Sequence, residues 1–180
     1  MVDIQVEMPG DGPAIEQLLD LSFGPGREHR PSYRLREGVA PDAALGLTAR
    51  DGSQLVGTIR FWPALIAGRV PALLLGPLAT DPGYRRQGIA RNLVKNGIGR
   101  ARARGHSLAF AVGDQWMFGR FGFIPATPLG LAMPGKIDDS RFLVLALRSD
   151  AIDGVEGVLY PAQAVSATLE ATVKAAPSGP

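Results

Sequence analysis

The most informative stretch of the sequence covers residues 75–94 and reads Leu75-Gly-Pro-Leu-Ala-Thr-Asp-Pro-Gly-Tyr-Arg-Arg-Gln-Gly-Ile-Ala-Arg-Asn-Leu-Val94. It predicts the end of a strand, a tight turn at Asp81-Pro82-Gly83, a basic loop and then a helix. The first backbone N–H groups of a helix lack intrahelical partners, and with the helix dipole they favour a bound anion. Gly88 and the small Ala90 let a phosphate approach the backbone, and nearby arginines add charge-assisted hydrogen bonds.

The residues of this loop do not match two other common phosphate-binding motifs. The loop lacks the Gly-Lys-Ser/Thr of a Walker motif and the Gly-x-Gly-x-x-Gly of a dinucleotide-binding motif. On residue types alone, a turn glycine flanked by solvated arginines explains Arg85 to Ala90 as well as a phosphate site does.

The helix that follows the loop is predicted over residues 88–105. At about 100° per residue, one apolar stripe runs along it; its members are Ala90, Leu93, Val94, Gly97, Ile98 and Ala101. Because a helical glycine costs about 1 kcal/mol relative to alanine, Gly97 indicates a close approach of this helix to a sheet. The basic residues divide between both flanks of the stripe, which favours a solvated surface over a nucleic-acid patch.

The rest of the chain predicts an α/β (α+β) domain with helices between groups of strands. Further strands are expected over 3–8, 44–48, 54–67, 70–80, 107–112, 130–132, 142–147 and 157–160, and further helices over 11–23 and 115–121. Without a repeat or a dividing linker, residues 1–165 are expected to form a single domain. The Ala-, Ser- and Pro-rich tail 166–180 is expected to fray.

Composition narrows the classes of function. The 180 residues include no cysteine, which excludes disulfides, thiolate metal sites and cysteine nucleophiles. The net charge is only +2 despite a pI near 9.3, which argues against a nucleic-acid-binding domain. Two histidines without a nearby carboxylate cluster predict no metal site. No apolar run is long enough for a membrane helix and residues 1–11 lack a signal-peptide pattern, so a cytoplasmic protein is expected.

The sequence resembles the GNAT N-acetyltransferase superfamily over roughly residues 2–147. The resemblance rests on Arg85-Arg-Gln-Gly-Ile-Ala90, which matches the signature Arg/Gln-x-x-Gly-x-Gly/Ala, on its lead-in Leu78-Ala-Thr-Asp-Pro82, and on Tyr84. The later Phe118-Gly-Arg-Phe-Gly-Phe123 is similar to the family's Tyr-x-x-x-Gly-Phe. The closing Ala151-Ile-Asp-Gly-Val-Glu-Gly-Val-Leu-Tyr-Pro161 resembles a bacterial branch of poorly characterised members.

The resemblance implies a mixed, mostly antiparallel sheet with helices on both faces, splayed between its fourth and fifth strands. Acetyl-CoA would enter at the splay, which Gly76-Pro77 could begin, and its acetyl group would pass directly to an acceptor amine. The Leu78 N–H would polarise the thioester carbonyl and stabilise the oxyanion. The residues implied to bind the cofactor are Leu78, Ala79, Thr80, Arg85, Arg86, Gln87, Gly88, Ile89, Ala90, Arg91, Val112, Phe118 and Phe121.

The sequence departs from the family at the general acid. Many members place a tyrosine where this chain has Phe118, which has no proton to donate. Three alternatives stay open: water or another residue protonates the leaving thiolate, the enzyme is slow, or the domain is a non-catalytic acyl-CoA-binding or regulatory module. A positioned acid contributes about 10²- to 10⁴-fold.

The general base and the acceptor are equally open. Asp114 is a candidate base that also suits a helix cap, and His29 is a candidate that also suits an exposed loop. The segment expected to wall the acceptor site carries Arg27, Arg30, Arg34 and Arg36. These arginines could receive an acidic acceptor or the 3′-phosphate of the cofactor, or they could be solvated surface. The expected partner is a small-molecule or peptide amine, and a homodimer is possible by the same resemblance.

Overall fold

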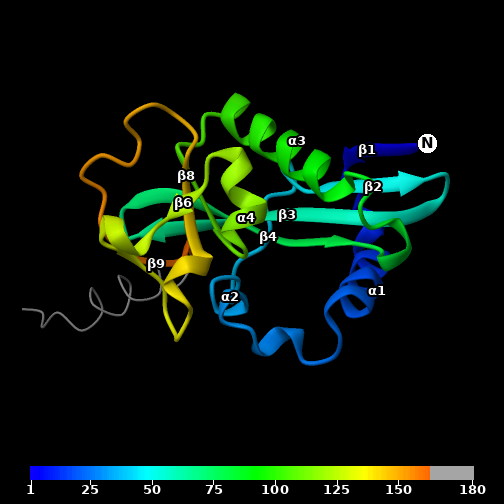
Figure 1. Cartoon of the computed structure of the whole chain (residues 1–180), viewed down its shortest axis with the longest axis horizontal. Coiled ribbons are helices and arrows are strands. Elements are labelled where there is room, and N and C mark those ends of the chain that lie inside the picture. The colour runs from blue at the N-terminus through cyan, green and yellow to red at the C-terminus, as the bar shows by residue number, and fades with distance from the viewer. Residues whose placement is uncertain (163–180) are drawn as a thin grey trace, which may run out of the picture.

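The computed structural model describes residues 1–162, which form a nine-stranded sheet with helices around it (Figure 1). The strands are β1 (Val2–Val6), β2 (Leu47–Asp51), β3 (Gln54–Ile66), β4 (Val70–Thr80), β5 (Leu108–Val112), β6 (Ile124–Pro125), β7 (Leu131–Ala132), β8 (Phe142–Ala146) and β9 (Gly157–Pro161). The helices are α1 (Gly12–Phe23), α2 (Pro31–Arg34), α3 (Ile89–Ala103) and α4 (Gln115–Phe118).

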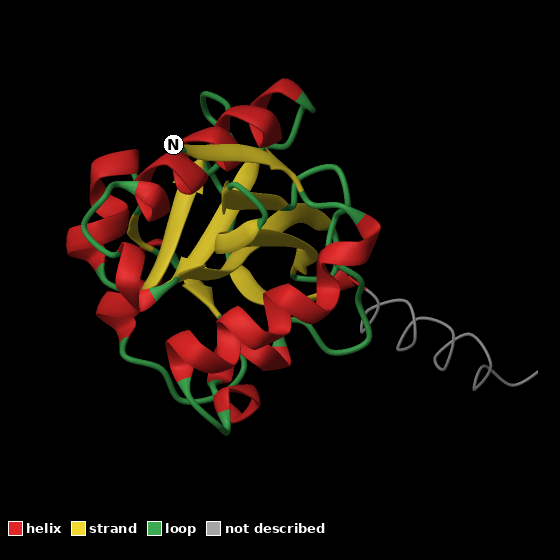
Figure 2. Ribbon diagram, turned by 90° about the vertical axis from the view of Figure 1, so that its right-hand side faces the viewer, coloured by secondary structure: helices red, strands yellow, loops and turns green. Residues whose placement is uncertain are grey.

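The sheet is mixed and mostly antiparallel, as predicted. Its strand order is β1-β2-β3-β4-β5-β8-β6, with β9 beside the end of β3 and β7 beside β9. Within residues 1–162, the only parallel pairs are β4–β5 and β7–β9. The strands occupy the centre of the molecule and the helices surround them (Figure 2).

Helix α3 covers one face of the sheet with an apolar stripe. Its buried residues are Ile89, Leu93, Val94, Gly97, Ile98 and Ala101. The predicted stripe is confirmed from Leu93 onward, but in the first turn Ile89 is buried and the predicted Ala90 is only partly buried. A Cβ atom added at Gly97 would lie only 2.7 Å from the ring of the fully buried Phe61 on β3. The close approach predicted from this glycine is therefore confirmed.

Helix α1 covers the opposite face. Its buried residues Ile15, Leu18 and Leu19 form a cluster with Ala79, whereas the neighbouring Leu78 packs against the core under α3. Successive residues of a strand point to opposite faces, so the two helices lie on opposite faces of β4, as Figure 1 also shows. The prediction of helices on both faces is confirmed.

Strands β4 and β5 are joined over only part of their length. The register pairs Leu73, Leu74 and Leu75 with residues 109–111, and no pairing follows, although β4 runs on to Thr80. On its other edge, β4 shifts register against β3 at the point where Gly76 and Pro77 lie. The Trp62 indole N–H donates a hydrogen bond to the Gly76 carbonyl at 2.5 Å and holds this irregularity. The splay predicted between the fourth and fifth strands is present.

Two local predictions need correction. A strand was expected over 44–48, but β2 begins only at Leu47. Asp42 accepts hydrogen bonds from the backbone N–H groups of Ala44, Leu45 and Gly46, and this turn holds the residues that precede the strand. Strand β6 was not expected, and its two residues are too few for a period-two pattern.

The predicted tail 166–180, with the last residues of the predicted domain, lies outside the described residues. Within residues 1–162, no helix combines the length and the apolar character that crossing a bilayer requires.

Candidate active site

Two residues of the loop before α3 have left-handed backbone conformation. Arg86 has φ +64° and Gly88 has φ +80°, a region that costs a non-glycine residue about 1 kcal/mol or more. Among residues 1–162, no backbone group or side chain accepts a hydrogen bond from the N–H groups of residues 86–91. These donors lie at the positive end of the α3 dipole, where an anion is favoured.

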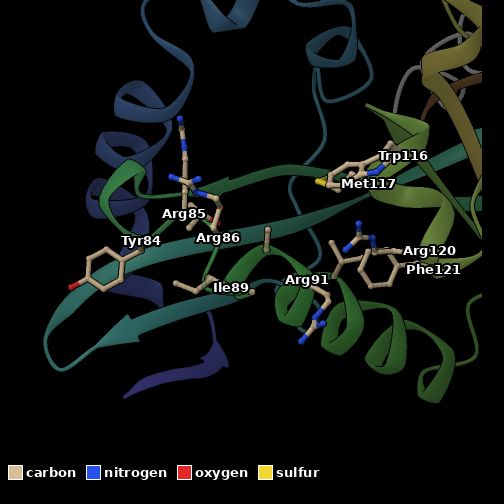
Figure 3. A pocket seen from close by; sticks show the side chains of 13 residues that line it. Tyr84, Arg85, Arg86, Ile89, Arg91, Trp116, Met117, Arg120 and Phe121 are labelled. Carbon is tan, nitrogen blue, oxygen red and sulfur yellow. The ribbon is translucent and has the colours of Figure 1, made fainter.

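A cavity of about 240 Å³ opens in front of these donors. Figure 3 shows Arg85, Arg86 and Ile89 on one side of it, supplied by the loop and the first turn of α3. The other side carries Trp116, Met117, Arg120 and Phe121 from α4 and the turn after it. An anion-binding backbone thus faces an aromatic and apolar wall across a space that suits a long, partly apolar ligand with phosphate groups.

A second cavity, of about 360 Å³, lies where β4 and β5 separate. Thr80, Arg85, Ala90 and Met117 line both cavities, so the two spaces adjoin. The lining of the second cavity includes Ser22, Phe23, Arg30, Ser32, Tyr33, Arg36, Gly76, Pro77, Leu78, Ala79, Val112, Gly113, Asp114, Phe118 and Arg141. It carries four arginines and one aspartate, which gives this space a positive potential.

The backbone of β4 presents hydrogen-bonding groups to this second cavity. The N–H of Asp81 donates to Val56 on β3, and the register from Leu78 to Thr80 against β3 is regular. Because alternate residues of a strand direct their N–H groups to opposite edges, the N–H groups of Leu78 and Thr80 face the splay. The Thr80 carbonyl agrees with this direction, since it accepts a hydrogen bond from the Ser22 hydroxyl at 3.4 Å.

Arg36 is a partly buried cation on the α2 side of the second cavity. Its guanidinium carbon lies 4.4 Å from the centre of the Tyr33 ring and 5.7 Å from that of Trp62. Burial lowers the pKa of Arg36 to about 10; the neighbouring Tyr33 acts against this shift, and the Arg27 and Arg60 charges add to it. Arg36 therefore carries its charge at neutral pH, at an energetic cost.

Unlike Arg36, Arg27 forms ion pairs and hydrogen bonds with its neighbours. Its side chain is only 8% exposed and donates to Asp20 at 2.8 Å, to Glu16 at 2.5 Å and to the Tyr33 hydroxyl at 2.8 Å. Burial acts to lower the pKa of Arg27, but these hydrogen bonds raise it above its ordinary value. The network attaches the segment around α2 to helix α1.

Most of the residues predicted for the site lie together. The residues that line one or both cavities are Leu78, Ala79, Thr80, Arg85, Arg86, Gly88, Ile89, Ala90, Arg91, Val112, Asp114, Phe118 and Phe121. Gln87 and His29 line neither cavity, and both are exposed. The roles assigned to all of these residues stay predictions.

Two of the predicted residues have surroundings that bear on those roles. Asp114 occupies the N-cap position of α4, but its side chain makes no capping hydrogen bond and instead lies 3.4 Å from Arg141. Asp114 therefore occupies the expected cap position but does not form the capping hydrogen bond. The ring of Phe118 is buried, and its centre lies 5.4 Å from that of Phe123 in an edge-to-face arrangement.

Sequence reasoning missed residues that line or adjoin the second cavity. Ser22 and Arg141 line it, and Trp62 lies beside it through its hydrogen bond to the Gly76 carbonyl. The spacing around them shows no motif, because only the tertiary fold brings them to β4. The four arginines of residues 27–36 were noticed, but nothing in the sequence separates the satisfied Arg27 from the unpaired Arg36.

Comparison with known proteins supports one family for this geometry. Residues 12–123 match the Acetyltransferase (GNAT) family. The uncharacterized N-acetyltransferase YhbS of Escherichia coli K12 is 35% identical over 158 residues, which cover 87% of this chain and 93% of that protein.

Solved structures of the same family are similar to this chain over most of its length. The crystal structure of E. coli YhbS in complex with CoA has a TM-score of 0.78 at 35% identity and covers 89% of each chain. A Brucella melitensis GNAT family acetyltransferase in complex with acetyl-CoA has a TM-score of 0.66 at 26% identity, over 89% of this chain and 95% of that one. With its splayed sheet and its basic loop before α3, this chain belongs to the GNAT family of acetyltransferases.

Proposed function

We propose that this protein transfers an acetyl group from acetyl-CoA to an amine, with the cofactor in the two adjoining cavities. The main support is the row of unpaired backbone donors over residues 86–91, next to a cavity that continues along the free edge of β4. The pyrophosphate would accept hydrogen bonds from these donors. The pantetheine arm would extend between β4 and β5, and the similar proteins solved with CoA and acetyl-CoA support this placement.

In this proposal the chemistry takes place beside Leu78. The amine attacks the thioester carbon, a C–N bond forms, and the carbonyl oxygen takes up negative charge. The Leu78 N–H would donate to that oxygen, and such a donor is worth roughly 3–4 kcal/mol in comparable sites. When the intermediate collapses, the C–S bond breaks, the nitrogen releases a proton and the thiolate takes one up.

With Phe118 at this position, the protein has no general acid there to protonate the leaving thiolate. The phenylalanine ring has no hydroxyl, so it supplies no proton to the thiolate. A thiol has an ordinary pKa near 8.5, so its thiolate can leave unassisted and take its proton from water. In this proposal the enzyme acts without a general acid at this position and forgoes the roughly 10²- to 10⁴-fold that such a group contributes.

The first experiment measures acetyl-CoA binding by isothermal titration calorimetry of the wild type and Gly88→Val. The variant should bind at least tenfold more weakly, because a side chain at φ +80° both strains the loop and enters the space before the donors. Gly105→Val is the matched control, since Gly105 has φ +84°, follows the other end of α3 and has open space around it. Equal affinities of all three proteins would refute the phosphate site.

Turnover is tested separately from binding. We expect steady release of free thiol from acetyl-CoA when the wild type is given a panel of amines, and no release by Gly88→Val at the same cofactor concentration. Tight cofactor binding without turnover on any amine would instead favour the non-catalytic acyl-CoA-binding module that the absent tyrosine suggests.

A further inference from the structure

The acceptor side of the second cavity contains a guanidinium that lies against two aromatic rings but has no carboxylate partner within residues 1–162. Among residues 1–162, no carboxylate lies within ion-pair distance of Arg36. Its Nε atom is shielded from solvent and makes no hydrogen bond. Burial of a guanidinium without a carboxylate is costly, and a strongly perturbed ionisable group in a cleft is a candidate functional group.

Arg36 lies away from the donors proposed for the pyrophosphate. Gly76, which Arg36 approaches, precedes Thr80 by four residues, about 13 Å in a regular strand and less here because of the register shift. The phosphate donors lie beyond Thr80, at the start of α3. Arg36 is thus at the far end of the proposed pantetheine channel, past the thioester.

Gly76 shows how close Arg36 is to the proposed reacting centre. A Cβ atom added at Gly76 would lie 3.2 Å from Arg36 Nη2 and 4.0 Å from the backbone nitrogen of Leu78. The guanidinium and the proposed oxyanion donor therefore border one small space, which a side chain at position 76 would fill. A ligand in this space would contact both groups at once.

We propose that the acceptor is a small amine with a carboxylate a few bonds from its nitrogen, as in an amino acid, and that Arg36 binds this carboxylate. The inference rests on the proposed acetyl transfer. The guanidinium edge pairs with the planar carboxylate, and the short distance to Leu78 places the amine beside the thioester carbon. Arg30, which lines the same cavity and has no ion pair within the described residues, adds positive charge at the entrance.

The experiment measures free-thiol release with the common amino acids other than cysteine, whose own thiol would react in the assay, and with their carboxamides, which keep the amine and lose the carboxylate charge. For the best acceptor, the acid should have a kcat/KM about 10- to 100-fold above that of its amide, as expected for one charged hydrogen-bonded pair. Arg36→Gln should abolish this preference, and Arg36→Lys should restore part of it. Arg34→Gln is the matched control, because Arg34 is exposed, ends α2 two residues before Arg36 and lines neither cavity.

Two further measurements separate binding from structure. Trp62 is the single tryptophan left in Trp116→Phe, and its fluorescence should change with added sodium acetate but not with acetamide or sodium chloride. Arg36→Met should raise the Tm of the ligand-free protein, because it removes a buried charge that has no partner, whereas a structural arginine would lower the Tm when replaced.

The outcomes are decisive in both directions. Equal turnover of acids and amides, or a preference that survives in Arg36→Gln, overturns the proposal. If no amine in the panel is acetylated, an acetate response of Trp62 that Arg36→Gln loses supports the anion site, and its absence overturns it. Failure of the proposed transfer itself would appear separately, as an absence of acetyl-CoA binding in calorimetry or as binding without turnover on any amine, and neither result depends on the acetate response of Trp62.

Discussion

Gly97 and Gly99 lie two residues apart in α3 and have opposite surroundings. A Cβ atom at Gly97 would overlap the Phe61 ring, which is fully buried and has no room to move. A Cβ atom at Gly99 would meet nothing within 4 Å. Packing therefore requires a glycine at position 97, whereas Gly99 only lowers the helix propensity of α3.

The two alanine substitutions should consequently change stability in opposite directions. Gly99→Ala should raise the free energy of unfolding by about 0.5–1 kcal/mol through helix propensity. Gly97→Ala gains the same propensity but should lower the free energy of unfolding by about 1–2 kcal/mol net, because overpacking outweighs it. Urea denaturation of both variants measures the difference, and a stabilised Gly97→Ala would show that α3 can move away from the sheet.

At the scale of elements, the segment that carries α2 depends on Arg27 for its position. Arg27 connects Glu16 and Asp20 of α1 with the hydroxyl of Tyr33 in α2. Tyr33 in turn packs against Arg36 at the second cavity. One buried cation thus orients the wall on which the proposed acceptor site is built.

Arg27→Met should loosen this wall without affecting the cofactor. We expect the free energy of unfolding to fall by roughly 1–3 kcal/mol, as for other losses of a partly buried charged network. The KM for the acceptor should rise while the Kd for acetyl-CoA stays unchanged, because the residues at the phosphate donors do not contact Arg27. Arg34→Met, in the same segment, is the control, and an equal effect of both substitutions would contradict the role of the network.

The elements also show which features could be predicted from sequence. The bounds of β4 and the apolar stripe of α3 were predictable, because they depend on contiguous residues with a clear period. The start of β2 was predicted wrongly because the Asp42 turn competes with the strand. The position of the loop before α3 was predictable for the same reason, since the loop lies in one stretch of chain; its binding of phosphate stays a prediction.

The acceptor wall was not predictable in this way. Arg36, Trp62 and Gly76 are separated by long stretches of sequence, and their contact arises only when the sheet forms. Whether an arginine is solvated or buried without a partner depends on those contacts. The sequence therefore supplied the candidate arginines but could not rank them.

At the scale of the whole molecule, the sheet consists of two parts with little direct connection. Strands β1 to β4 form one part together with β9 and β7, which continue from β3, and strands β5, β8 and β6 form the other; only three register pairs join β4 to β5. The two proposed cofactor cavities lie on this boundary, with walls from both parts. A bound cofactor would therefore bridge the parts where backbone pairing is absent.

Saturating CoA should accordingly stabilise both parts of the sheet together. At a CoA concentration of about 100 times Kd, linkage adds roughly 2.7 kcal/mol, which for a chain of this size raises Tm by about 5–10 °C. Amide hydrogen exchange should slow at residues 78–80 and 86–91 on one side and at residues 112–118 on the other, while β1 at the far edge should change little. Slowing confined to residues 86–91 would mean that the ligand occupies only the phosphate loop, and the arm would then not lie between the separated strands.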